Sequence, residues 1–167
     1  MNRVFGITGW KNSGKTTLTE RLVAEFVRRG VRVSTVKHAH HDFDIDIEGT
    51  DSFRHRAAGA SEVAIVSGRR WALMHELRGE DEPSLEQVLA RLAPCDLVLV
   101  EGYKREPHAK IEVRRLVTKD RAPLAPTDPN IAAIAADHQV AESALPVFDL
   151  DDVPAIADFI ARTTGLA

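Results

Sequence analysis

The stretch GWKNSGKTTL, residues 9–18, constrains the fold of this chain more than any other part of the sequence. It matches the phosphate-binding pattern G-x-x-x-x-G-K-[ST] at each fixed position, with Gly9, Gly14, Lys15 and Thr16. The glycines let backbone N–H groups turn toward phosphate oxygens, Lys15 reaches the β- and γ-phosphates, and the Thr16 hydroxyl can bind Mg²⁺. Because such a loop joins a strand to a helix, the motif predicts an α/β chain that binds a nucleotide.

The residues on either side of this motif have the patterns that it requires. Residues 3–8, RVFGIT, form a short apolar run typical of a buried strand. Leu18, Leu22 and Phe26 then recur at helical spacing, and Gly30 is a natural end for that helix. Residues 31–38 return to strand chemistry, so the first 38 residues predict one βαβ unit.

The rest of the chain alternates apolar strands with amphipathic helices. Thr50 or Asp51 caps a helix that runs to about residue 58, and Ser84 with Gln87 opens another. The remaining expected elements are a hairpin over residues 62–77, strands at 96–104, 109–115, 131–137 and 145–148, and a closing helix from 152. We therefore predict a P-loop NTPase fold of the α/β class, with a mostly parallel sheet flanked by helices and a β-hairpin extension.

Composition limits the classes of protein to which the chain can belong. Its 167 residues predict a single nucleotide-binding domain over residues 1–167. A net charge of −3, with no basic stripe, gives no support to nucleic-acid binding. Cys95 is the single cysteine, and no apolar run is long enough for a signal peptide or a membrane span. We therefore expect a cytoplasmic protein that binds no membrane.

An acidic residue is needed beside the phosphate loop to organise the metal ion. Glu101 ends the apolar run LVLVE, where burial of a carboxylate would be costly without a partner. We therefore expect Thr16 and Glu101 to be the Mg²⁺ residues.

The polar stretch after residue 37 has several interpretations. His38, His40 and His41 are followed by Asp42, Asp44, Asp46 and Asp51. The block could hold a transition metal, sense the γ-phosphate and Mg²⁺ through an aspartate, bind a second anionic substrate, or be a solvated loop. It follows the strand expected beside the P-loop strand, which favours a switch or second-substrate role. We take Lys15, Asp46 and Glu101 as the candidate catalytic residues.

Two further features concern the base and the surface. Asp137 ends a buried strand and is a candidate for reading the edge of a nucleobase. Trp71 and Leu73, on a short strand, are expected in a core or an interface.

Five segments occur in the order found in the MobB family, the adaptor proteins of molybdopterin-guanine dinucleotide biosynthesis. They are GWKNSGKTTL, VKHAHHDFDID, GTDSFRHRAAGA, RWALM and LVLVEGYKREPHAKIEV. The chain resembles this family over roughly residues 3–115, and more weakly through IAAIAAD. The block from residue 37 to 60, followed by RWALM and VEGYK, is more specific than the P-loop alone.

The resemblance implies a dimeric GTP-binding protein that hydrolyses GTP weakly. It implies a partner, the nucleotidyltransferase MobA, which joins GMP to molybdopterin, and possible contact of this chain with molybdopterin. The residues that carry over as ligand-binding candidates are Gly9, Asn12, Ser13, Gly14, Lys15, Thr16, Thr17, His38, His40, His41, Asp51 and Arg54, with Glu101 at the metal. In related NTPases a lysine can follow the first P-loop glycine, but here Trp10 stands there.

Two other functions compete with the adaptor role. A small-molecule kinase would use a lid of arginines, for which Arg54, Arg56, Arg69 and Arg70 are candidates. A nucleotide-gated metal carrier would use the histidine block. Neither a water-orienting glutamine nor an arginine finger is identifiable, which favours slow or partner-dependent hydrolysis.

Overall fold

The fold is that of a computed structural model, which describes residues 3–39, 43–141 and 143–166. The chain divides into two compact units, one of residues 1–38 with 88–167 and one of residues 39–87. The boundary between residues 87 and 88 falls within helix α3 (Leu85–Arg91). The division leaves the predicted single domain a prediction, and each unit is described by itself.

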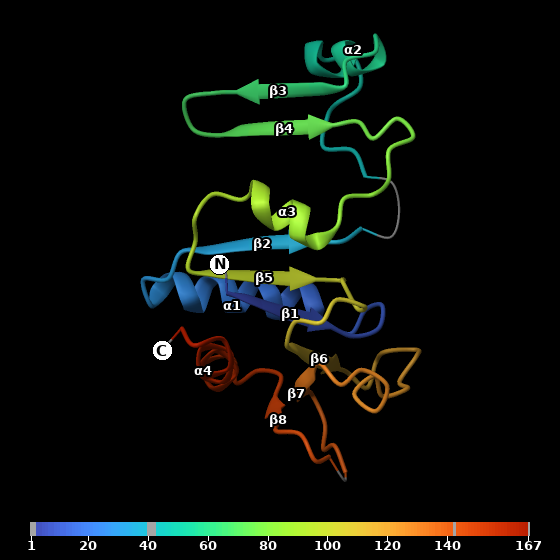
Figure 1. Ribbon diagram of the computed structural model, residues 1–167. Helices are drawn as coiled ribbons and strands as arrows, with labels where there is room; N and C mark the ends of the chain where they lie inside the picture. The colour runs from blue at the N-terminus through green and yellow to red at the C-terminus, as the bar shows by residue number, and fades with distance from the viewer. Residues whose placement is uncertain (1–2, 40–42, 142, 167) are drawn as a thin grey trace. The chain divides into compact units, whose positions relative to one another are not determined.

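The first unit is built on a parallel sheet with strand order β2-β5-β1-β6-β7-β8 (Figure 1). The sequence analysis placed the strand of residues 31–38 beside the P-loop strand, and this is wrong, because β5 lies between β1 and β2 and pairs with both. All neighbouring pairs in the described part of this sheet run parallel, which confirms the sheet predicted from the sequence. The strands are β1 (Val4–Thr8), β2 (Val33–Lys37), β5 (Leu97–Glu101), β6 (Lys110–Arg114), β7 (Ile131–Ala136) and β8 (Val147–Asp149).

Helices α1 (Lys15–Arg28) and α4 (Val153–Thr164) pack against each other and against β1. The spacing of Leu18, Leu22 and Phe26 turns one side of α1 to the sheet, and all three are buried. Asp152 caps α4 by accepting a hydrogen bond from the Ala155 amide at 3.1 Å. This core places the start of α1, and hence the P-loop, at the carboxyl end of β1.

Over β6, a segment without helix or strand covers buried charged side chains. Glu112 is 1% exposed and accepts the amides of Leu124 and Ala125 at 2.9 Å each. Lys110, also 1% exposed, donates to Asp128 at 3.0 Å. These bonds satisfy the buried charges and fasten the proline-containing segment 115–130 onto the sheet.

The second unit contains helix α2 (Asp51–Ala57) and an antiparallel hairpin of β3 (Glu62–Val66) and β4 (Trp71–His75). The Thr50 hydroxyl caps α2 by accepting from the Phe53 amide. At the start of α3, Ser84 and Gln87 form the predicted reciprocal capping pair, at 2.8 and 3.2 Å. The helix, the hairpin and the cap predicted for this stretch are therefore confirmed.

The hairpin exposes apolar side chains that the sequence analysis placed in a core or an interface. Val63 and Met74 face each other across the hairpin and are buried, whereas Trp71 is 71% exposed and Leu73 is 49% exposed. Successive side chains alternate between the two faces of a strand, so Trp71 and Leu73 lie on the other face of the hairpin from Met74. The core assignment for these two residues is wrong, and the interface remains a prediction.

Candidate functional site

The P-loop is a tight backbone loop between β1 and α1. Gly9 and Gly14 have φ angles of 148° and 92°, and Asn12 has 64°. A Cβ atom at Gly9 would lie 2.6 Å from both the Ser13 Oγ and the Val113 carbonyl oxygen, so only glycine fits there. Gly14 gives α1 no side-chain cap, and the helix N-terminus keeps backbone N–H groups to offer an anion.

Lys15 and Trp10 interact within this loop. The Lys15 ammonium donates to the Trp10 carbonyl oxygen at 2.8 Å. Burial lowers the pKa of Lys15; Glu101 opposes this, while repulsion from Lys104 and Lys37 adds to it. A partly buried ammonium with a single backbone acceptor is well suited to take up phosphate oxygens.

Thr16 and Glu101 come together as the sequence predicts. The register of the parallel strands sets Glu101 beside Ile7 of β1 and Lys37 of β2. The Thr16 hydroxyl donates to the Glu101 carboxylate, with distances of 3.2 and 3.3 Å to its two oxygens. Glu101 is 9% exposed, and a hydroxyl beside a carboxylate is an oxygen donor set that suits Mg²⁺. The Lys37 ammonium lies 3.9 Å from the same carboxylate.

His38 lies at the edge of this site, immediately after β2. Its ring centroid is 4.9 Å from that of Tyr103, and its Cβ is 2.9 Å from where a Cβ at Gly102 would be. Gly102 therefore needs to be glycine for the turn after β5 to approach β2. His40 and His41 lie outside the described residues.

Asp46, Asp51 and Arg54 belong to the second unit. The Asp46 carboxylate accepts from Ser52 at 2.7 Å, Thr50 at 3.1 Å and Arg56 at 3.2 Å. Burial favours a higher pKa for Asp46, but these hydrogen bonds outweigh it and lower the pKa. Asp51 and Arg54 form an exposed pair at 3.9 Å. These bonds define local structure, and the catalytic role of Asp46 stays a prediction.

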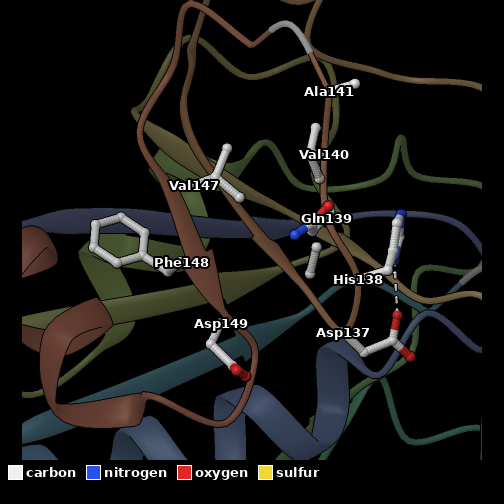
Figure 2. A pocket seen from close by; sticks show the side chains of 9 residues that line it. Asp137, His138, Gln139, Val140, Ala141, Val147, Phe148 and Asp149 are labelled. Atoms are coloured by element: carbon white, nitrogen blue, oxygen red, sulfur yellow. Dashed lines mark hydrogen bonds and ion pairs between the residues drawn. The ribbon is translucent and has the colours of Figure 1, made fainter.

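Asp137 follows β7 and accepts three hydrogen bonds. The donors are the Leu116 amide at 3.0 Å, Arg115 Nε at 3.4 Å and His138 Nδ1 at 2.9 Å. Asp137, His138 and Gln139 line an open pocket of about 570 Å³ (Figure 2). Figure 2 shows the Asp137–His138 bond and, on the other side of the pocket, Val147 and Phe148 of β8. The pocket is large enough for a nucleobase.

A second, narrow pocket lies beside the P-loop. Its lining holds three buried polar atoms with no hydrogen-bond partner in the described residues, namely Ser13 Oγ, Arg114 Nε and Thr118 Oγ1. Native structures rarely leave buried polar atoms unsatisfied, so these atoms are suited to water or ligand. His138 lines both pockets, so the two pockets lie on either side of one residue next to Asp137.

A family model described as MobB, molybdopterin guanine dinucleotide synthesis protein B, matches residues 4–137. The chain belongs to the MobB family. An adapter protein of molybdopterin-guanine dinucleotide biosynthesis from Haemophilus influenzae is 42% identical over 159 residues, covering 94% of this chain and 86% of the relative. The Escherichia coli adapter protein is 36% identical over 159 residues, covering 94% and 90%.

Solved MobB structures are similar to this chain in fold as well as in sequence. A MobB homologue from Bacillus stearothermophilus matches with a TM-score of 0.72 and 32% identity, covering 99% of each chain. Bacillus subtilis MobB matches with a TM-score of 0.74 and 26% identity, covering 97% of this chain and 98% of the other. The resemblance and the fold class predicted from the sequence are thus confirmed, and the MobB match extends beyond Arg115 to Asp137.

Three further observations concern the described residues of this MobB chain. Arg56, one of the arginines assigned to a kinase lid, is bonded to Asp44, Asp46 and Glu76. In the described ranges, no group of three or more His, Cys, Asp or Glu side chains is placed to hold a metal ion. None of the described helices combines the length and apolar character needed to cross a bilayer.

Sequence reasoning missed three residues at the site. Trp10 was noted only as a replacement for lysine, yet its carbonyl holds Lys15. Lys104 lies 4.5 Å over the Trp10 ring, and the Arg115 side chain lies against Gly14. The signal for Lys104 was its position three residues after Glu101, in the motif VEGYK.

Proposed function

We propose that this MobB-family chain is a GTP-binding adapter in molybdenum cofactor biosynthesis. It assists the nucleotidyltransferase MobA in attaching GMP to molybdopterin. The observation that carries the nucleotide part is the Thr16–Glu101 contact beneath an uncapped helix N-terminus, with Lys15 beside it. The similarity to adapter proteins of molybdopterin-guanine dinucleotide biosynthesis supports the adapter part.

In this proposal the P-loop holds the triphosphate. Backbone N–H groups from Gly9 to Thr17 and the Lys15 ammonium bind phosphate oxygens, and Lys15 gives up the Trp10 carbonyl to do so. Thr16 and Glu101 hold Mg²⁺, which when bound neutralises charge on the β- and γ-phosphates. Glu101 is positioned for this by its strand, because β5 is buried along its whole length.

The nucleoside extends from the P-loop toward Asp137. The support for this direction is that one pocket lies beside the P-loop, another beside Asp137, and His138 lines both. An ionised carboxylate has about four acceptor positions, and Asp137 uses three, so it can accept a guanine N–H. Adenine presents no N–H at the equivalent ring position, which gives the site a basis for preferring GTP.

We expect slow GTP hydrolysis because of where the two glutamines of the sequence lie. Gln87 is used in the cap of α3, and Gln139 lines the pocket beside Asp137. Neither is bonded to the Thr16–Glu101 pair in the described residues, so orientation of an attacking water falls to the partner enzyme.

Apolar side chains in the second unit supply a surface for a homodimer and for MobA. Large exposed ones are Phe43, Ile45, Ile47, Ile65, Val66, Trp71 and Leu73. A two-stranded hairpin is marginal by itself and has open edges, so association would stabilise it.

The histidine block that contains His38, His40 and His41 is the proposed contact for the molybdopterin phosphate. We place this assembly in the cytoplasm, where the free thiol of Cys95 would remain reduced.

Calorimetric titration with GTP, GDP and ATP, with and without Mg²⁺, tests the nucleotide part. We expect GTP to bind at least about tenfold more tightly than ATP, and Mg²⁺ to tighten GTP binding. Asp137→Asn should reduce the preference for GTP, and Glu101→Gln should reduce the effect of Mg²⁺. Equal affinity for GTP and ATP would contradict the proposed base recognition. Added MobA should then form molybdopterin-guanine dinucleotide faster with this chain than with its Lys15→Ala variant.

A further inference from the structure

Trp10 holds two ammonium groups at the mouth of the P-loop. Its carbonyl oxygen accepts from Lys15 Nζ at 2.8 Å. The Nζ of Lys104 lies 4.5 Å from the centroid of the Trp10 ring, within the range of a cation–π interaction. One residue of the loop therefore contacts both lysines.

The ring and the second lysine are both fixed by the backbone around them. The Trp10 indole N–H donates to the Ala122 carbonyl oxygen at 2.7 Å, which sets the plane of the ring. Lys104 comes three residues after Glu101, where Gly102 turns the chain with a φ angle of 110° against His38. The ammonium of Lys104 is thus brought to the P-loop from the end of β5.

The charge balance of this region favours a polyanion. Lys37 and Lys104 both repel the ammonium of Lys15, and the Glu101 carboxylate attracts it and lies 3.9 Å from Lys37. Lys15 is half-buried, whereas Lys37 and Lys104 are exposed. Like charges beside a half-buried ammonium repel it, and the repulsion is relieved when an anion binds. A nucleoside triphosphate carries more negative charge than Lys15 alone can balance.

We propose that Lys104, held on the ring of Trp10, is a second phosphate-binding lysine that contacts the terminal phosphate of the bound nucleoside triphosphate. This inference rests on the proposed function. When the nucleotide binds, Lys15 exchanges the Trp10 carbonyl for phosphate oxygens. Lys104 keeps its place on the ring and turns its N–H groups to the γ-phosphate.

The test compares GTP with GDP in calorimetric titrations of single variants. Lys104→Ala should weaken GTP binding about tenfold, the value of one charge-assisted hydrogen bond, and GDP binding less than about twofold. Lys119→Ala removes an equal charge from an exposed site in the same unit and should leave both affinities within about twofold. An equal loss for GTP and GDP, or no loss, would overturn the assignment.

Variants of Trp10 test how Lys104 is held. Trp10→Phe keeps an aromatic face without the N–H that binds Ala122, and in this background Lys104→Ala should still cost GTP affinity. In Trp10→Leu the added effect of Lys104→Ala on GTP should fall below about twofold. An undiminished effect there would show that the ring does not hold Lys104 and would overturn the inference.

The two proposals fail in different ways. If the wild-type protein binds GTP and Lys15→Ala abolishes binding while Lys104→Ala does not change it, only the inference on Lys104 is wrong. If the wild-type protein does not bind GTP, the proposed function itself is wrong.

Discussion

The P-loop region differs from the Arg56 network, which is Arg56 with its three carboxylate partners, in how its polar side chains are bonded. Beside the P-loop, Ser13 and Thr118 are buried with hydroxyl groups that have no partner in the described residues, and Lys15 reaches a backbone carbonyl. In the second unit, the Arg56 guanidinium is bonded to Asp44 at 2.9 Å, Asp46 at 3.2 Å and Glu76 at 2.9 Å. Unsatisfied donors mark a place prepared for a ligand, whereas satisfied ones hold a loop in shape.

This contrast bears on the histidine–aspartate block. Asp46 was a candidate for sensing the nucleotide, yet its oxygens accept from three side chains of its own unit. For Asp46 to contact Mg²⁺ or phosphate, this network would have to open. Glu101, whose carboxylate contacts Thr16 of the P-loop, is therefore the stronger candidate for the proposed metal site.

Lys15→Ala gives the largest expected effect and separates binding from folding. Nucleotide binding should weaken at least about a hundredfold, because the ammonium supplies charge-assisted bonds to two phosphates. The thermal midpoint should change little, since Lys15 faces the ligand side and not the core formed by Leu18 and Leu22. Titration calorimetry and circular dichroism measure the two effects. A variant that is unfolded without nucleotide would show that Lys15 is structural.

The stability of the folded protein is expected to depend on pH through His108, whose side chain lies against the backbone of Gly6. Burial, followed by repulsion from Lys110, lowers the pKa of His108 to about 4. The unfolded chain therefore binds a proton more readily, so stability is full above about pH 6.5 and falls as the pH drops toward 4. After allowance for solvent screening, the loss is about 1–2 kcal/mol.

Thermal melts between pH 4 and 7.5 measure this loss. His108→Asn should flatten the dependence of the midpoint on pH in that range. A slope equal to that of the wild-type protein would assign the acid sensitivity to other groups.

Arg56→Ala gives the smallest expected effect on nucleotide affinity and the clearest test of what stabilises the second unit. Removal of the guanidinium leaves three carboxylates without their shared partner, so amides of residues 43–76 should exchange hydrogen several-fold faster. GTP affinity should stay within about twofold. For the exchange measurement, Arg54→Ala, which removes an exposed arginine of the same helix, is the matched control. A large loss of GTP affinity in Arg56→Ala alone would mean that the network serves the nucleotide site.

The sequence by itself determined the parts that depend on local pattern. The P-loop, the βαβ unit, the capped helices α2 and α3, and the hairpin follow from residue spacing and capping side chains, and each was found in the predicted stretch of sequence. The expected pairing of the two strands of the βαβ unit was wrong, because β5 lies between β1 and β2. Thr16 and Glu101 were paired correctly, because the carboxyl ends of parallel strands meet at one edge of a sheet.

The tertiary structure alone decided which distant side chains meet. Trp10 and Ala122 are far apart in the sequence, and nothing in their local pattern indicates that they share a hydrogen bond. Likewise, the buried Lys110 and Glu112 lie in an alternating strand that could face solvent, and only the folded segment 115–130 buries them. Periodicity reports which face of an element is apolar, but the partners of a polar side chain depend on how separate elements pack. For that reason the phosphate loop could be read from the sequence, whereas the place of Lys104 beside it could not.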